Sequence, residues 1–174
     1  SLSLIIDTTI LNIYLTTINQ EGYMIEYDDL KKIAFFKDFT EDELRSLQDL
    51  CCEESYKKGD FVFVEDSLAE HLYVLKKGMI SIDIKVTGGK YISVLTVSHF
   101  ADSFGWSALV EPFKFTASAR CVKDSSVFSI HGKKLMALIE KDYRMGFLIM
   151  RRVAKMTSER VLNTRLQLIQ CFYG

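Results

Sequence analysis

The sequence predicts a mainly β domain: a β-roll of the jelly-roll or cupin-like type, with N-terminal helices before it and a long C-terminal helix after it. Between residues 51 and 131, short stretches rich in β-branched and aromatic residues recur at regular intervals, with turn signals between them. On either side of this region, apolar residues return at helical spacing. The chain therefore divides into a helical segment at 1–50, the roll at 51–131 and C-terminal helices at 132–174.

The N-terminal segment is expected to be helical. Apolar residues between Thr8 and Ile18 have mixed helical spacing. Further along, Thr40 is followed three residues later by Glu43, which is the pattern of a capping box. A helix is therefore expected to begin at Thr40 and to run to about Leu50.

The central region is expected to hold short strands separated by glycine turns. The predicted strands are Glu53–Tyr56, Asp60–Val64, His71–Leu75, Met79–Ile84, Tyr91–Val97, Thr116–Cys121 and Ser126–Ile130. Turn signals lie at Gly59, Gly78 and the pair Gly88-Gly89, where glycine can supply a positive φ. Strands this short, with no helices between them, are typical of an all-β sandwich or barrel.

Two helices are expected after the roll, a short one over Lys133–Ile139 and a long one from Tyr143 to about Cys171. One apolar stripe of the long helix holds Phe147, Met150, Ala154, Val161 and Leu168, and an adjoining stripe holds Ile149, Val153 and Met156. Two stripes suggest two packing partners, the roll and a second copy of the chain, so a homodimer through residues 143–171 is expected. One wide stripe on a monomer is the alternative. The basic residues Arg151, Arg152, Lys155, Arg160 and Arg165 are expected to face water.

The composition favours one ordered domain that contacts neither nucleic acid nor membrane. The chain has 174 residues, of which 48% are hydrophobic and 26% charged, and its net charge is -1. Binding to phosphate backbones requires a basic surface, and a net charge of -1 gives no indication of one. No signal peptide or membrane-spanning stretch is evident, so a cytoplasmic location is expected. The chain ends at Gly174 without a helix-turn-helix, so direct DNA binding is not expected; a sensor domain truncated from a longer transcription factor stays an alternative.

Metal binding and catalysis find no support in the sequence. The four cysteines, Cys51, Cys52, Cys121 and Cys171, include no CxxC pair and are interpreted as reduced thiols used as small hydrophobes. The histidines His71, His99 and His131 lie about thirty residues apart with no HxH pattern, which does not predict a metal site. No arrangement of nucleophile and base is recognisable, so the chain is not expected to be an enzyme.

The segment at residues 103–119 is the most informative about function. A strand ends at Gly105, a few helix-forming residues follow, Pro112 stops them, and a β-type segment resumes. A short helix that opens at a glycine directs backbone N–H groups and the positive end of its dipole at one place. The sequence therefore predicts an anion site at this loop.

From Ile33 to Cys171 the chain resembles the cyclic-nucleotide-binding domain family. The matching residues are Ile33-Ala-Phe-Phe, Thr40-Glu-Asp-Glu-Leu, Lys58-Gly59-Asp60-Phe-Val-Phe, His71-Leu-Tyr-Val-Leu-Lys-Lys-Gly78, Phe104-Gly105 and Ala108-Leu109. This resemblance implies a non-catalytic regulatory domain that senses a small-molecule effector. The loop at 103–119 then corresponds to the family's phosphate-binding cassette.

The cassette departs from the family pattern, which reads Phe-Gly-Glu-Leu-Ala-Leu with a later Arg. The resemblance implies that the Glu accepts from the ribose hydroxyl and that the Arg pairs with the cyclic phosphate. Here Trp106 stands at the Glu position, Phe115 at the Arg position and Ala101 at a preceding Gly. Desolvating a phosphate without its Arg costs several kcal/mol unless Lys114 or Arg120 compensates, which puts conventional cyclic AMP or cyclic GMP binding in doubt.

The candidate ligand-binding residues are Phe104, Gly105, Trp106, Ser107, Ala108, Lys114, Phe115, Thr116 and Ala117. The pocket is expected to have walls of Trp106, Phe113 and Phe115, and hydroxyls from Ser107, Thr116 and Ser118. Such a lining suits a small apolar or aromatic ligand. Two alternatives stay open: a filled pocket in a ligand-free structural or dimerisation module, and a cyclic nucleotide bound through altered contacts.

A mechanism follows from this placement. Ligand in the roll is expected to move the cassette helix at Trp106–Val110, which shifts the short helix at Lys133–Glu140 and changes the angle of the long helix. The ligand can do so only if it binds one arrangement more tightly than the other. The output would be an altered dimer surface offered to a partner protein.

Overall fold

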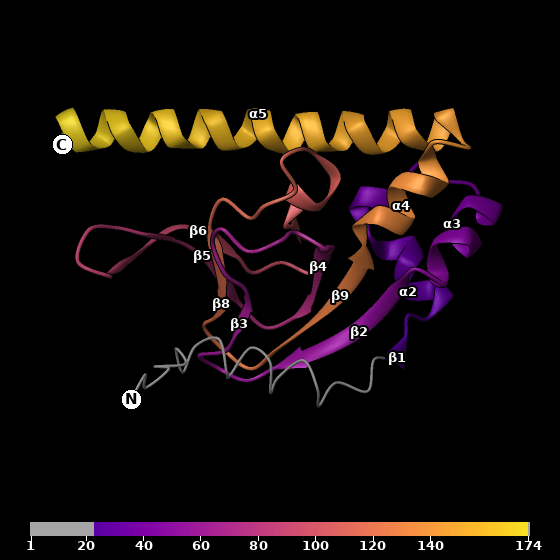
Figure 1. Ribbon diagram of the computed structural model, residues 1–174, viewed down its shortest axis with the longest axis horizontal. Helices are drawn as coiled ribbons and strands as arrows, with labels where there is room; N and C mark the ends of the chain where they lie inside the picture. The colour runs from indigo at the N-terminus through magenta and orange to yellow at the C-terminus, as the bar shows by residue number, and fades with distance from the viewer. Residues whose placement is uncertain (1–22, 174) are drawn as a thin grey trace, which may run out of the picture.

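The chain folds into a roll of two facing antiparallel sheets, with one long helix lying across it (Figure 1). The computed structural model describes residues 23–173, so the helix expected between Thr8 and Ile18 lies outside the described residues. The five-stranded sheet has the order β1-β2-β9-β4-β7, and the four-stranded sheet has the order β3-β8-β5-β6. This architecture confirms the predicted fold class.

The strands are β1 (Tyr23–Met24), β2 (Cys51–Tyr56), β3 (Phe61–Phe63), β4 (His71–Lys77), β5 (Ile80–Lys85), β6 (Tyr91–Val97), β7 (Ser103–Phe104), β8 (Ser118–Cys121) and β9 (Ser125–His131). The helices are α2 (Tyr27–Lys32), α3 (Glu41–Gln48), α4 (Gly132–Ile139) and α5 (Tyr143–Tyr173), with 3₁₀ turns η1 (Ala34–Phe36) and η2 (Trp106–Leu109). Each of the predicted strands is present. The two that the sequence did not predict, β1 and β7, have two residues each and are defined by their pairing with β2 and β4.

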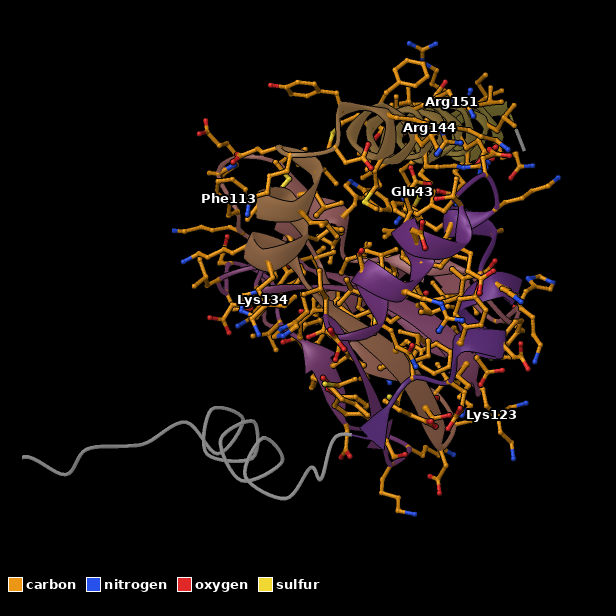
Figure 2. All side chains as sticks on the ribbon, turned by 90° about the vertical axis from the view of Figure 1, so that its right-hand side faces the viewer. Glu43, Phe113, Lys123, Lys134, Arg144 and Arg151 are labelled. Atoms are coloured by element: carbon orange, nitrogen blue, oxygen red, sulfur yellow. The ribbon has the colours of Figure 1, made fainter. Side chains whose placement is uncertain are left out.

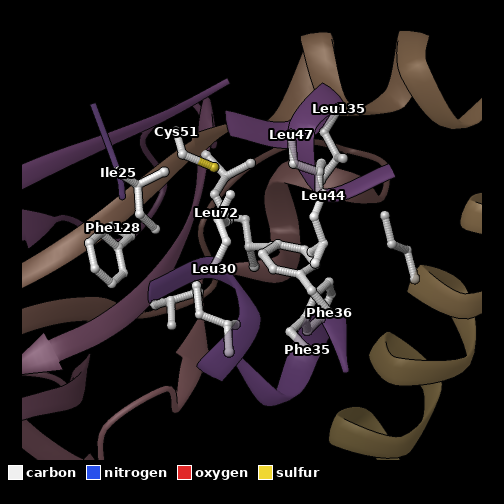
Figure 3. Close-up of a cluster of buried hydrophobic side chains, with 14 of the residues drawn as sticks. Ile25, Leu30, Phe35, Phe36, Leu44, Leu47, Cys51, Leu72, Phe128 and Leu135 are labelled. Atoms are coloured by element: carbon white, nitrogen blue, oxygen red, sulfur yellow. The ribbon is translucent and has the colours of Figure 1, made fainter. Parts of the chain in front are cut away.

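Strands β4 and β9 are buried on both faces and separate two hydrophobic cores. The roll core lies between the two sheets and contains Tyr73, Leu75 and Val127. The helical core lies on the outer face of the five-stranded sheet, where Leu72 and other β4 and β9 side chains meet the helices (Figure 3). A movement of the sheet or of the cassette can therefore reach the helices through direct packing.

Helix α3 begins as the sequence predicts. The Thr40 Oγ1 accepts a hydrogen bond from the Glu43 backbone N–H at 3.3 Å, and the Glu43 Oε2 accepts one from the Thr40 N–H at 2.6 Å. This reciprocal pair is the predicted capping box, and it fixes the start of α3 at Glu41. The Glu43 side chain is also available to α5, which approaches it from above (Figure 2).

The turns of the roll also follow the predicted chemistry. Gly59, Gly78, Gly88 and Gly89 all have positive φ. Gly78 is the most constrained, because a Cβ there would clash with Ser125 at the start of β9. The positive φ explains the glycines at these turns, of which Gly88-Gly89 joins the β5–β6 hairpin, whereas Gly59 and Gly78 lie where the chain passes from one sheet to the other.

Helix α5 has two different halves. Near its start, Met145, Ile149 and Val153 are buried in the helical core, which confirms that one predicted stripe covers the roll. Beyond residue 160 the helix is exposed, and Val161 and Leu168 of the other stripe are 44% and 54% exposed. The amphipathic pattern therefore describes an anchor in the first half and an uncovered apolar stripe in the second. Within residues 23–173, no helix has the length and the apolar run that a bilayer crossing requires.

Candidate functional site

The cassette loop turns at Gly105 and continues as η2. Gly105 has φ 77°, a left-handed conformation that glycine adopts without strain, and it follows directly on the short strand β7. Residues Trp106–Leu109 form a 3₁₀ turn of four residues, in which the Ala108 N–H donates to the Gly105 carbonyl at 3.2 Å. A turn this short has no macrodipole of the kind an α-helix carries, so the predicted helix-terminus anion site is not supported.

Aromatic side chains fill the roll beneath the cassette. The rings of Phe63 and Phe115 stack with centroids 3.7 Å apart and an interplanar angle of 9°, while Tyr73 stacks on Phe104 at 5.5 Å. The cavity that remains has a volume of about 50 Å³. It is lined by Phe63, Ile82, Phe104, Gly105, Trp106, Ser107, Phe115, Thr116, Ala117 and Arg160. Small-molecule pockets measure about 300 Å³ or more, so this space is too small for a nucleotide.

Most of the predicted site residues meet at this cavity, but four expected contributors, Ala108, Phe113, Lys114 and Ser118, do not. Phe113 is 36% exposed and lies on the outer surface of the loop (Figure 2). The Ser118 hydroxyl is buried and accepts a hydrogen bond from the Glu65 N–H at 3.0 Å, so it serves the loop structure. Ala108 is buried against Gly132 at the start of α4 instead of facing the cavity. Phe113, expected as a wall of the pocket, and Ser118, expected as one of its hydroxyls, therefore do not line the cavity.

The two cations near the cassette do not replace a cassette arginine. Lys114 is exposed and forms an isolated bridge to Leu68, outside the cavity lining. Arg120 is held by Asp83, with its Nη2 2.8 Å and its Nε 2.9 Å from the Asp83 Oδ2. Asp83 is fully buried and Ser81 donates to it, so the charge of Arg120 is needed to compensate this carboxylate. The sequence allowed Lys114 or Arg120 to replace the cassette arginine whose position Phe115 occupies. In the structure neither of them does so.

Arg160 of α5 reaches the cassette, which the sequence did not predict. Its guanidinium carbon lies 5.6 Å from the centre of the Trp106 ring, and its Nη1 is buried with no hydrogen-bond partner in the described part of the chain. Burial lowers the pKa of this guanidinium. The expectation that Arg160 faces water is therefore wrong. The helical spacing could have predicted this position. Arg160 continues the stripe of Ile149, Val153 and Met156, which faces the roll, at spacings of four and three.

A second and larger cavity lies between α5 and the roll. It has a volume of about 400 Å³ and is bounded by β6, the loop before β7, Trp106 and one face of α5. Its lining residues are Ala34, Phe35, Leu95, Thr96, Val97, Ala101, Asp102, Ser103, Trp106, Arg152, Lys155, Met156, Glu159, Arg160 and Asn163. Trp106 and Arg160 border both cavities, so they form the wall between them.

Ion pairs clamp the first half of α5 to the N-terminal helices. The Arg144 Nη1 lies 2.6 Å from both carboxylate oxygens of Glu43, whose side chain is 9% exposed. Arg151 and Arg152 both reach the Asp38 carboxylate, at 3.2 and 2.6 Å. Arg151 is exposed, as expected, and Arg152 is partly buried; both belong to this clamp, to which Arg144 and Glu43 also contribute (Figure 2).

Two glycines allow close contacts between the cassette, α4 and α5. A Cβ on Gly132 would lie 2.6 Å from the Ala108 carbonyl oxygen, so η2 packs directly on the first residue of α4. A Cβ on Gly146 would lie 3.2 Å from the Ile139 carbonyl oxygen, so the end of α4 packs on the first turn of α5. The cassette, α4 and α5 thus form one continuous packed chain of contacts.

The comparisons with known proteins agree with this architecture. The family model for the cyclic nucleotide-binding domain matches residues 53–142. The chain is 28% identical to a candidate cyclic nucleotide-binding protein from Geobacter metallireducens, with a TM-score of 0.70 over 79% of this chain and 99% of that one. A cyclic nucleotide-binding domain from Methylobacillus flagellatus has the same TM-score at 14% identity, over 85% of this chain and 83% of that one, and supports the fold alone.

A longer curated relative comes from Drosophila melanogaster. Its cGMP-dependent protein kinase, isozyme 2, forms cD5/T2, is 29% identical over 97 residues, which is 55% of this chain and 10% of the kinase. The chain thus spans about a tenth of the length of the curated relatives it matches.

Proposed function

Because the chain belongs to the cyclic nucleotide-binding domain family, we propose that it is a non-catalytic sensor of a small molecule other than a conventionally bound cyclic nucleotide. One observation carries this proposal. Phe115, at the position where the family resemblance expects an arginine, is stacked on Phe63 inside the roll. The remaining cavity of about 50 Å³ has no room for a cyclic phosphate, and neither cation of the cassette segment lies in its lining.

The energetics support the same proposal. A cyclic phosphate monoanion in this aromatic cavity would lose its hydration without gaining a charge-assisted partner from the cassette segment, because Lys114 faces water and Arg120 pairs with Asp83. The cost of such an unpaired buried charge is several kcal/mol, which exceeds what a few neutral hydrogen bonds return. Ordinary cyclic-nucleotide recognition is therefore disfavoured at this cassette.

The signal is proposed to pass from the cassette to α5 by direct packing. A ligand that displaces Trp106 would move η2, and Gly132 carries that displacement to α4 because it touches Ala108. Gly146 joins α4 to α5 in the same way. A ligand that prefers one arrangement of these three elements would then bias the angle of α5.

The output surface is proposed to be the second half of α5. Its exposed apolar residues are Val161, Leu162, Leu166, Leu168, Ile169 and Phe172. Among them Leu162, Leu166, Ile169 and Phe172 recur at spacings of four, three and three along the helix, which is the pattern by which two copies of a helix pair. We expect size-exclusion chromatography with light scattering to report a dimer, and Leu162→Glu with Leu166→Glu to give a monomer. Lys133→Glu, an exposed position on α4, is the control that should leave the dimer intact.

The first experiment is isothermal titration of the full chain with cyclic AMP and cyclic GMP, with thermal shift on the same samples. The proposal expects neither heat nor a rise in melting temperature at millimolar nucleotide. Micromolar binding with a raised melting temperature would contradict the proposal. It would indicate that the chain binds cyclic nucleotides, as the names of its relatives suggest.

A structural module without a ligand is the second candidate function. The stacked Phe63 and Phe115 favour it, because a core filled to normal density needs no ligand for stability. The larger cavity beside Trp106 favours the sensor instead. Hydrogen exchange along α5 separates the two candidates: a module shows the same protection with every small molecule tested, whereas a sensor shows protection that depends on a specific one.

A further inference from the structure

The larger cavity lies outside the family's cassette and has the dimensions of a binding site. Its volume of about 400 Å³ falls in the range of small-molecule pockets, about 300 to 1,000 Å³, whereas the cassette cavity does not. The roll side of the cavity is largely apolar and includes Phe35, Leu95 and Trp106. The other side is the polar face of α5.

The α5 wall carries three cations, of which only one lacks an acidic partner. The Arg152 Nη2 lies 2.6 Å from the Asp38 Oδ2, and the Lys155 Nζ lies 3.6 Å from the Glu159 Oε1. Arg160 takes part in none of the ion pairs found among residues 23–173. The remaining acid of the lining, Asp102, accepts a hydrogen bond from the His99 N–H at 3.0 Å.

One nitrogen of the Arg160 guanidinium is also shielded from water. Its Nη1 is buried and makes no hydrogen bond to any described residue, although a guanidinium has five N–H donors to satisfy. The face of Trp106 at 5.6 Å provides a cation–π contact but accepts no conventional hydrogen bond. Proteins rarely leave a buried charged donor without a partner, since the lost hydration is not returned.

We propose that this cleft between Trp106 and α5 binds a small organic anion, with its carboxylate or phosphate on Arg160 and its apolar or aromatic body against Trp106. Guanidinium groups bind such oxyanions through two parallel N–H bonds, which fixes orientation as well as charge. The inference rests on the proposed sensor function and names the chemistry of the effector.

This placement also couples binding to the helix. Arg160 belongs to α5, whereas Trp106 belongs to the cassette, so an anion that bridges them binds only while α5 lies over the roll. Its binding energy then stabilises the docked arrangement of α5. The ligand would act on α5 directly as well as through α4.

The single tryptophan of the chain makes the site observable, because Trp106 lines the cleft and is the sole source of tryptophan fluorescence. The probes are benzoate and phenyl phosphate, with benzamide as their uncharged counterpart. The full chain should show saturable quenching by both anions and none of comparable affinity by benzamide. Arg160→Met keeps the apolar stem and removes the charge, and should weaken anion binding at least about ten-fold. Arg165→Met, on the exposed part of α5, is the matched control and should change it less than about two-fold.

Thermal melting without any anion provides a second, independent readout. If Arg160 is an unpaired charge held for a ligand, Arg160→Met should melt at or above the temperature of the original chain, and the stabilisation by benzoate should disappear. A merely structural Arg160 would give a lower melting temperature, with benzoate still stabilising the variant, and that result would overturn the inference. Equal anion affinities for Arg160→Met and Arg165→Met would overturn it as well.

Failure of the proposed function is distinguishable from failure of this inference. Tight cyclic AMP binding that survives in Arg160→Met, with no anion quenching of Trp106, would contradict both. Tight cyclic AMP binding that requires Arg160 would support the anion cleft, while contradicting the proposal that the effector is not a cyclic nucleotide.

Discussion

The two cavities beside Trp106 differ in position and in volume. The cassette cavity keeps the position expected for a family ligand but is reduced to about 50 Å³ by stacked aromatic rings. The cleft under α5 has about 400 Å³ and an unpaired guanidinium, but lies on the other side of the cassette. The fold is thus preserved while the larger volume is found beside the helix instead of inside the roll, which shows that fold alone does not locate a ligand site.

The largest expected effect comes from opening the small cavity. Phe115 is 4% exposed, and Phe115→Ala should lower the free energy of unfolding by about 3–5 kcal/mol, because it removes a stacked ring from the roll core. Phe113→Ala, two residues earlier and 36% exposed, should cost less than about 1 kcal/mol. Urea unfolding of both variants measures the difference. Equal losses of stability would contradict the packing of Phe115 in the roll core and of Phe113 on the surface.

The clamp that holds α5 over the larger cleft should have the next effect. Glu43→Gln removes the charge that faces Arg144 and weakens the capping box, so we expect a loss of about 1–2 kcal/mol in the free energy of unfolding. Glu41→Gln in the same first turn affects only the exposed pair with Arg45 and should change stability less. Chemical unfolding of the two variants compares them directly. A larger loss of stability for Glu41→Gln would contradict the role of the Glu43–Arg144 pair in holding α5.

The same carboxylate predicts a dependence of stability on pH. Burial alone would raise the pKa of Glu43, but hydrogen bonds from Arg144 and Thr40 outweigh it and hold the pKa below its ordinary value of 4.5. A depressed folded-state pKa contributes stability that is present above pH 4.5 and lost as the pH falls further. The melting temperature of the original chain should therefore fall more steeply below pH 4.5 than that of Glu43→Gln. If the melting temperatures of the two proteins fall in parallel below pH 4.5, Glu43 does not contribute to the pH dependence of stability.

The smallest expected effect concerns the backbone that borders the larger cleft. Ala101 has φ 70°, and the family resemblance expects glycine there, so Ala101→Gly should raise the free energy of unfolding by about 0.5–1 kcal/mol. Ala117→Gly, at a residue without positive φ, should lower it by a similar amount. Thermal unfolding distinguishes the two signs. A loss of stability in Ala101→Gly would argue that the Ala101 methyl group is needed where it packs.

Local sequence signals predicted the elements that depend on local chemistry. The Thr40–Glu43 capping box, the glycine turns and the alternating strands of the roll are encoded within a few residues, so they were predicted correctly. Strands β1 and β7 were missed because two residues carry no periodicity, and each exists only through its neighbour.

The candidate site was predicted less well because it depends on which distant elements meet. The sequence identified Trp106 and Phe115, but it could not show that Phe63 from another strand stacks on Phe115. It assigned Phe113 to the pocket because orientation in an irregular loop has no period to follow. It placed Arg160 in water by residue type, although its helical phase pointed to the roll.

The most direct test of the central claim restores the family's residues at the cassette. Trp106→Glu with Phe115→Arg reintroduces the ribose acceptor and the phosphate partner, and a melting curve confirms that the double variant is folded. Isothermal titration should then show cyclic AMP binding at least about ten-fold tighter than in the original chain, which is expected to show none at millimolar nucleotide. If the original chain binds cyclic AMP as tightly as the folded double variant, Trp106 and Phe115 do not exclude the nucleotide, and the account is wrong.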